Sequence, residues 1–343
     1  MIRAISRSLL VALCVLSGSA FASGPKMFCA FDPVGANGFI YQLLQSYRLD
    51  AMRAGVALTM RPYTDEDELV RAFEAGDCDM IAATDMGARL YNQFTGSISA
   101  IGAIPNYDDL RVLLHILGSS RVAQHMETNT HQILGVTPMG GAYLFVNDRT
   151  IDRVERLEGQ RITILAGHHD ARHMAEYVGM IPVDATVANF ARLFNEGQAD
   201  VSYAPAAAYE TLEMFNGIGD TGGIIRFPIG QITIQLVARK GEFDDAFVRQ
   251  SRRIMSRLYN ESMRITRQFE TDIPAHLWVD IPEEAMNEYF EMLRQVRIDI
   301  SRGETREQLL AADSYHEEML TILRKVRCYN NPISQECAAA DRE

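Results

Sequence analysis

The first hundred residues alternate between short apolar runs and stretches in which apolar residues recur every three or four positions. Three runs have the length and composition of strands: Lys26–Phe31, Val56–Tyr63 and Met80–Ala83. Between them, Phe39–Ala54 and Asp65–Ala75 have the spacing of helices that bury one face. Strands that alternate with helices in this way pair in parallel through right-handed crossovers, so the pattern predicts an α/β sheet in the order 2-1-3.

A second α/β set follows the first. Its expected strands are Val136–Asn147, Arg161–Leu165, Val201–Ala204 and Ile232–Ala238, and its expected helices are Asp170–Val178, Val187–Glu196 and Ala206–Met214. Helical periodicity then continues in 243–269, 283–300 and 305–326, with breaks at Pro274 and Pro282. We therefore expect an α/β protein of two lobes that share crossover strands, with a helical C-terminus.

The domain boundaries follow from these two sets, and 343 residues suffice for two domains of ordinary size. The first expected lobe comprises residues 23–139 with part of 228–270. The second comprises residues 140–227 with part of 275–327, and residues 328–343 form a C-terminal tail.

The N-terminus has the pattern of a secretory signal peptide. Arg3 and Arg7 precede an apolar run, Leu9–Leu16, and Ala20 and Ala22 frame an A-x-A cleavage site. The run is shorter than the ~20 residues that span a bilayer as a helix. We expect cleavage of residues 1–22 and export of a protein that is not membrane-anchored, which predicts a periplasmic location.

Charge and motifs exclude several classes of function. Loss of the two N-terminal arginines takes the net charge from −12 to −14, which is unfavourable for binding nucleic acid or an anionic membrane surface. The sequence contains no G-x-S-x-G elbow, phosphate-binding loop or H-E-x-x-H motif. We therefore expect a binding protein without a cofactor and not an enzyme.

Four cysteines remain after the expected cleavage, and an even number in an oxidising compartment favours disulfides. Three pairings are possible. Cys328 and Cys337 bracket a short turn-rich segment, so a local bridge between them is the most economical choice. That leaves Cys29 to pair with Cys78, and the strand order 2-1-3 would bring these two close together.

Candidate ligand-binding residues come from one rule, that ligands of open α/β sheets bind at the carboxyl ends of strands. In the first lobe the rule selects Asp32, Asn37, Gly38, Thr84 and Asp85. In the second lobe and its crossover it selects His168, Asp170, Tyr203 and Phe227. Each has an alternative structural role, since Asn37 and Asp85 could cap helices and Phe227 could belong to the core.

A metal site is the alternative interpretation of one of these segments. His168, His169, Asp170 and His173 open a helix, and His169 and His173 lie one turn apart. A zinc receptor would need further ligands from the other lobe, for which Asp32 and Asp85 are the candidates. We expect a polar helix start and no metal here.

Several short motifs occur in an order that resembles a known family. Leu157–Gly159 has the form L-x-G, Gly179–Val183 the form G-x-x-P-V, and Gly197–Asp200 the form G-x-x-D, which Gly76–Asp79 repeats in the first lobe. This order resembles the DctP-like solute receptors of TRAP transporters. Further segments, at 92–98, 145–149, 226–229 and 325–328, resemble a branch of solute-binding proteins that sometimes carries an RND-type efflux label.

The resemblance implies a two-lobed fold of the type II periplasmic-binding-protein kind. It also implies a monomeric receptor that closes by a hinge on a small polar solute and delivers it to membrane transporter subunits. An accessory role in an efflux system is the alternative.

The resemblance leaves the charge of the ligand open. Thr163 stands where the related receptors place an arginine for a substrate carboxylate. Asp32 and Asp85 favour an amine, Arg161 or Arg226 would serve a carboxylate, and a neutral solute is the third alternative.

Overall fold

A computed structural model describes residues 24–303 and 315–339. The expected signal peptide and much of the first half of the helix expected at 305–326 lie outside the described residues. Within the described ranges, no helix combines the length and the apolar character needed to cross a membrane.

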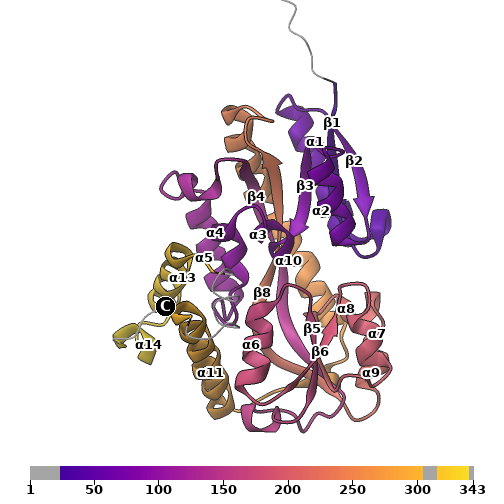
Figure 1. The fold of residues 1–343 in the computed structure, drawn as a ribbon, viewed down its shortest axis with the longest axis vertical. Coiled ribbons are helices and arrows are strands. Elements are labelled where there is room, and N and C mark those ends of the chain that lie inside the picture. Colours follow the sequence, from indigo (N-terminus) through magenta and orange to yellow (C-terminus); the bar gives the residue numbers. More distant parts are fainter. Residues whose placement is uncertain (1–23, 304–314, 340–343) are drawn as a thin grey trace, which may run out of the picture.

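In the described part of the chain, nine strands form one sheet in the order β2-β1-β3-β8-β4-β7-β5-β6, with β9 beside β8 (Figure 1). The strands are β1 (Lys26–Phe31), β2 (Leu58–Tyr63), β3 (Met80–Thr84), β4 (His131–Val146), β5 (Arg161–Leu165), β6 (Ile181–Ala185), β7 (Val201–Pro205), β8 (Gly223–Arg239) and β9 (Trp278–Val279). The first three pair in parallel in the predicted order 2-1-3, and β5 pairs in parallel with β6 and β7.

Helices pack around both halves of this sheet, the first half being the part around β1–β3 and the second the part around β5–β7 (Figure 1). Those of the first half are α1 (Phe39–Arg53), α2 (Glu66–Ala75), α3 (Asp85–Arg89), α4 (Gln93–Gly96) and α5 (Tyr107–Leu117). Those of the second half are α6 (His169–Tyr177), α7 (Phe190–Asn195), α8 (Ala208–Thr211) and α9 (Phe215–Ile218). The helical C-terminal part, which the sequence predicts, comprises α10 (Asp245–Asp272), α11 (Glu283–Arg302), α13 (Glu317–Asn330) and α14 (Gln335–Ala338).

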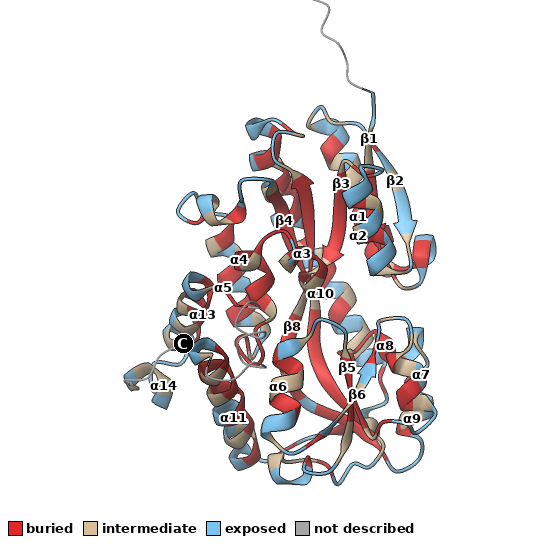
Figure 2. Cartoon of the chain, viewed as in Figure 1, coloured by how far each residue is buried: buried red, intermediate tan, exposed pale blue. Residues whose placement is uncertain are grey.

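Two long antiparallel strands, β4 and β8, connect the halves. They pair along most of their length, from His131 with Arg239 to Val146 with Gly223. The register shifts at several points, and at Gly140 the backbone adopts φ +118°, which favours glycine. The halves also share a core, since one apolar cluster contains Ile81 of β3 and Ile162 of β5. Figure 2 shows burial along the central strands, whereas the edge strand β2 is largely exposed.

Both predicted disulfides are present. Cys29 of β1 is bonded to Cys78, which precedes β3, with 5.9 Å between their Cα atoms. Cys328 and Cys337 join α13 to α14, with a Cα separation of 5.6 Å. The first bridge is fully buried beneath α2, since both of its cysteines have no exposed surface.

Several elements differ from the sequence expectations, among them α5, which is not expected from the sequence, and β4, which begins at His131 and not at Val136. Strand β6 escapes prediction because Pro182 is unusual in a strand, although an edge strand tolerates it. Strand β8 begins at Gly223, well before the expected Ile232, because β4 holds its irregular first part in the sheet. The helix expected at 206–214 ends after one turn, and Glu213 has φ +52°.

Candidate ligand-binding site

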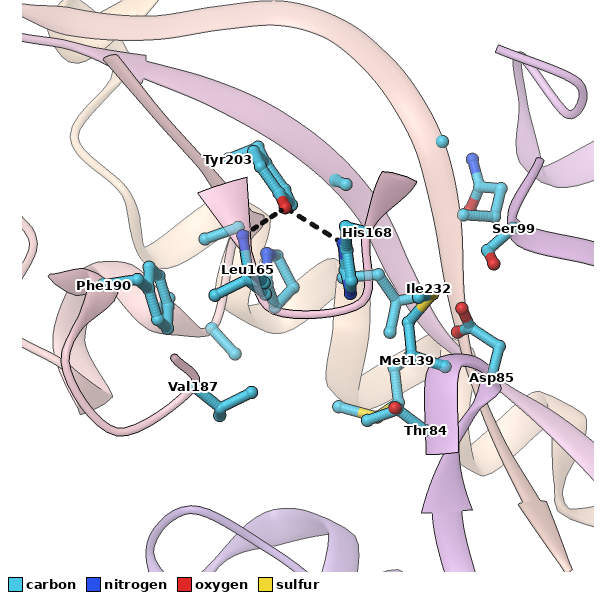
Figure 3. A pocket seen from close by; sticks show the side chains of 18 of the residues that line it. Thr84, Asp85, Ser99, Met139, Leu165, His168, Val187, Phe190, Tyr203 and Ile232 are labelled. Carbon is cyan, nitrogen blue, oxygen red and sulfur yellow. Dashed lines mark hydrogen bonds between the residues drawn. The ribbon is translucent and has the colours of Figure 1, made fainter. Parts of the chain in front are cut away.

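A cavity of about 190 Å³ lies between the two halves of the sheet (Figure 3). The first half contributes residues from the ends of β1 and β3, and the second half contributes residues from the ends of β5 and β7. Strand β8 supplies the shared wall through residues 229–232. A second hollow adjoins this cavity and shares Glu66, Met86, Leu165, His168 and Val187 with it, so we take the two as the inner and outer parts of one cleft.

Glu66 and Thr84 form a hydrogen-bonded pair on the first wall. Glu66 lies in the first turn of α2, where its carboxylate accepts bonds from the Thr84 backbone nitrogen at 2.6 Å and from its hydroxyl at 2.9 Å. Loss of hydration raises the pKa of the Glu66 carboxyl group to about 7. The two hydrogen bonds from Thr84 favour the charged form and act in the opposite direction, but burial has the larger effect. The pair thus holds a carboxyl group in the cleft.

Asp85 begins α3 directly after β3 and is only 3% exposed. Its Oδ1 atom accepts a hydrogen bond from the Thr233 backbone nitrogen at 2.8 Å, which attaches it to β8. Burial raises the pKa of Asp85, opposed by hydrogen bonds from Ser99 and Thr233 and by the charge of Arg89. Ser99 lies beside the Asp85 carboxyl group in Figure 3.

His168 and Tyr203 face the cavity from the second half (Figure 3). The Tyr203 hydroxyl group lies 2.9 Å from His168 Nδ1 and accepts a bond from the Leu165 backbone nitrogen at 3.2 Å. Burial lowers the pKa of His168 to about 4, so the imidazole is neutral at pH 7. His168 and Tyr203 therefore present uncharged polar groups to the cavity.

Asp170 joins the second half to the C-terminal segment. Its carboxylate accepts bonds from the Ala171 backbone nitrogen at 2.8 Å and from the Tyr315 hydroxyl at 3.0 Å. The Tyr315 oxygen in turn accepts a bond from the Ile101 backbone nitrogen of the first half at 3.2 Å. Tyr315 thus bridges the two sides of the cleft.

Five of the ten predicted residues line the cavity: Thr84, Asp85, His168, Asp170 and Tyr203. The other five, Asp32, Asn37, Gly38, Thr163 and Phe227, lie outside its lining, which corrects the expectation that they face the cleft. Whether the first five bind a ligand stays a prediction.

Each of the outlying residues has a structural role or an exposed position. Asp32 accepts bonds from three backbone nitrogens at the start of α1, and a Cβ atom at Gly38 would lie 1.7 Å from its Oδ1. Thr163 bonds to the hydroxyl of Ser202 at 2.7 Å inside the sheet, and Phe227 stacks on the Tyr289 ring at 5.2 Å. The Asn37 side chain is exposed.

The two arginines considered for a carboxylate also lie outside the cavity lining. Arg161 pairs with Asp200 at 2.7 Å, and Arg226 pairs with Asp280 at 2.5 Å while it covers the Trp278 ring. Both guanidinium groups therefore form ion pairs outside the cavity and do not contribute a cation to its wall.

Sequence reasoning missed most of the cavity wall, which is apolar. It includes Phe31, Phe39, Ile40, Ile101, Met139, Leu165, Val187, Phe190, Leu212 and Ile232. It also missed Glu66, in the first turn of the helix predicted at 65–75, and Gln231 on β8. A strand-end rule finds polar residues and gives no signal for apolar ones that face a cavity.

The residues considered for zinc do not converge. No group of three or more His, Cys, Asp or Glu side chains with metal-binding geometry exists within 24–303 and 315–339. His168 is bonded to Tyr203, and the His169 side chain is exposed.

Comparisons with known proteins agree on one type of protein. A family model described as "Solute-binding protein AdeT 1/2" matches residues 48–342. The curated "Probable solute-binding protein AdeT1" of Acinetobacter baumannii is 33% identical over 311 residues, which cover 91% of this chain and 99% of the relative.

Among solved structures, a TRAP periplasmic solute-binding protein of Desulfovibrio salexigens with bound orotic acid matches with a TM-score of 0.71. Its identity is 8%, over 89% of this chain and 99% of that one. A TRAP protein of Ralstonia eutropha with bound (S)-2-acetolactate matches with a TM-score of 0.68 and 12% identity, over 88% and 98% of the chains. At these identities the similarity shows a common two-lobed fold.

Proposed function

The chain belongs to the AdeT 1/2 family of solute-binding proteins, and from this premise we propose that it is an exported receptor for one small solute. In this proposal the solute binds between the two halves of the sheet, the halves close on it, and a membrane transporter receives it. The observation that carries the proposal is the cavity that both halves line.

The connection between the halves suits closure. β4 and β8 run continuously between them with α10 packed along β4, and the register shifts around Gly140 and Tyr143 interrupt the regular ladder there. Hinges of binding proteins are a few residues that absorb backbone rotation while the lobes move as rigid bodies. We assign the hinge to this part of β4.

The size and lining of the cavity constrain the solute. An apolar cavity of about 150 Å³ accommodates benzene, so about 190 Å³ suits a substituted six-membered ring or a molecule of similar size. The walls are mainly apolar, with a few polar groups that include Asp85, Gln231 and His168. We therefore propose a small solute that combines a polar group with an apolar body.

Two features support export. Residues 1–22 have the signal-peptide pattern, and both disulfides suit an oxidising compartment. The proposal assigns the protein to the periplasm and gives it no catalytic role.

Filling the cavity tests the receptor proposal. Val187 lies in the loop between β6 and α7 and faces the cavity, so the indole of a Val187→Trp variant should occupy the space of the solute (Figure 3). A thermal-shift screen of small ring compounds identifies ligands of the wild type, because a ligand that binds only the folded state raises the melting temperature. We expect Val187→Trp to lose that shift for every hit.

A matched variant controls for the added indole. Met52→Trp places the same side chain on α1 at a position that is 58% exposed, and it should keep every thermal shift. Hits that persist unchanged in Val187→Trp would contradict the assignment of the cavity. A screen without any hit would favour a role in which the protein binds another protein.

A further inference from the structure

We propose that the polar group of the solute is a protonated amine, held at the end of the cavity formed by Asp85 and Gln231. This inference rests on the proposed receptor function and specifies its ligand. It departs from the two related solved structures, whose bound orotic acid and acetolactate are carboxylic acids.

The charges around the cavity are the first support. Its lining includes three acidic side chains, Glu66, Asp85 and Asp170, and among the residues that the structure describes no arginine or lysine lines it. A carboxylate of the solute would enter this group of acids without a lining cation to pair with it. A cation would instead compensate buried negative charge, which is costly when it stays unpaired.

An unpartnered acceptor is the second, independent support. Gln231 is 2% exposed and lines the cavity. Its Nε2 atom donates to the Ile104 carbonyl oxygen at 3.3 Å, whereas its Oε1 atom is buried without a hydrogen-bond partner. A buried acceptor of this kind favours a ligand that donates a hydrogen bond, and an ammonium group has three donors.

The geometry of β8 places this acceptor near Asp85. Gln231 and Thr233 are two residues apart on the strand and therefore share one face of the sheet. The Thr233 backbone nitrogen donates to Asp85 Oδ1, so Asp85 lies at the same part of the strand. We take these two oxygens, which line the cavity beside the same stretch of β8, as an acceptor pair.

Arg89 is the competing feature. Its Nη1 atom is buried without a partner, and it lies on the outer hollow of the cleft and not on the inner cavity. The guanidinium group already donates to the Gly96 carbonyl oxygen at 3.0 Å and to the Ser99 hydroxyl at 3.1 Å. These bonds hold Arg89 behind the wall that Ser99 and Asp85 form, where its charge offsets part of the Asp85 charge. A carboxylate that displaced this arrangement is the alternative to the amine, and an Arg89→Gln variant distinguishes the two.

Three probes of nearly equal size test the inference: benzylamine, benzyl alcohol and benzoate. In calorimetric titrations at pH 7 we expect benzylamine to bind the wild type about tenfold or more tightly than benzyl alcohol, because hydrogen bonds to charged groups contribute more than neutral ones. We expect no detectable binding of benzoate.

Two variants assign the effect to the acceptor pair. Asp85→Asn keeps an oxygen for the Thr233 bond but removes the charge, and it should reduce benzylamine affinity about tenfold while benzyl alcohol affinity stays within about twofold. Gln231→Leu removes the second acceptor and should also weaken benzylamine selectively. Asp220→Asn, at an exposed position outside the cavity lining, should bind all three probes as the wild type does.

Other outcomes overturn the inference in distinguishable ways. If benzoate binds more tightly than benzylamine and loses affinity in Arg89→Gln, the site is an anion site, while the receptor function stands. If Asp85→Asn and Gln231→Leu both leave benzylamine affinity unchanged, the acceptor pair does not hold the amine. If none of the probes binds and the wider screen has no hit, the inference and the receptor function fail together.

Discussion

Replacing Cys29 and Cys78 together by alanine is expected to lower the free energy of unfolding by about 4 kcal/mol. The bridge joins residues 49 apart in sequence, and a cross-link stabilises the folded state mainly by restricting the unfolded chain, more so for longer loops. Urea unfolding of the oxidised protein, followed by circular dichroism, measures the change.

The second bridge provides an internal comparison. Cys328 and Cys337 are only nine residues apart, so the same reasoning predicts a loss of about 2.5 kcal/mol for their double alanine variant. Equal losses from the two pairs would contradict the dependence on loop length. The prediction would also fail if the Cys29/Cys78 variant unfolded at the urea concentration of the wild type.

Asp32→Ala is expected to cost about 3 kcal/mol of folding stability. The carboxylate has no exposed surface and accepts bonds from the backbone nitrogens of Val34, Ile40 and Tyr41, at 2.9, 2.9 and 3.1 Å. Alanine would leave the buried nitrogens of Ile40 and Tyr41 unpaired at the start of α1 and would remove the bond that fixes the preceding loop at Val34, and each unpaired buried donor costs about 1 kcal/mol or more. Thermal and urea unfolding should both register the loss.

A surface helix cap gives the matched control. Asp244 caps α10 at an exposed position through one bond from the Phe247 nitrogen, at 2.7 Å, so Asp244→Ala should cost only about 1 kcal/mol. If Asp32→Ala and Asp244→Ala lowered the free energy of unfolding by the same amount, the buried hydrogen bonds of Asp32 would contribute no more than a single surface cap, and the prediction would be wrong.

Periodicity predicts the regular parts of this fold from sequence because regular elements bury one face. β1 and β5 have the predicted bounds, and α1 and α2 begin within one residue of theirs. The same reasoning fails at residues 223–231, the first part of β8, because Pro228 and Gly230 disrupt the alternation on which a strand prediction depends. Pairing with β4 and β9, both distant in sequence, makes that segment a strand.

The candidate site likewise has a part that the sequence predicts and a part that it does not. Position after a strand suffices to find Thr84, Asp85 and His168, because the chain direction fixes which end of the sheet they occupy. Asp32 satisfies the same rule, yet its side chain turns toward the nitrogens of α1 and away from the cleft. The apolar wall escapes prediction, because a residue such as Phe190 has the same pattern whether it contacts a ligand or the core.

The pairing of β3 with β8 also determines when the molecule can fold during synthesis. Thr84 pairs with Ile234, about 150 residues further along the chain, so β3 keeps one unpaired edge until most of the protein has left the ribosome. Contacts this distant in sequence close slowly, because a long loop must be ordered before they form. We therefore expect the nascent chain to stay unfolded for longer than its local helices and strands suggest, which suits the export proposed above, because an unfolded chain can be threaded through a channel.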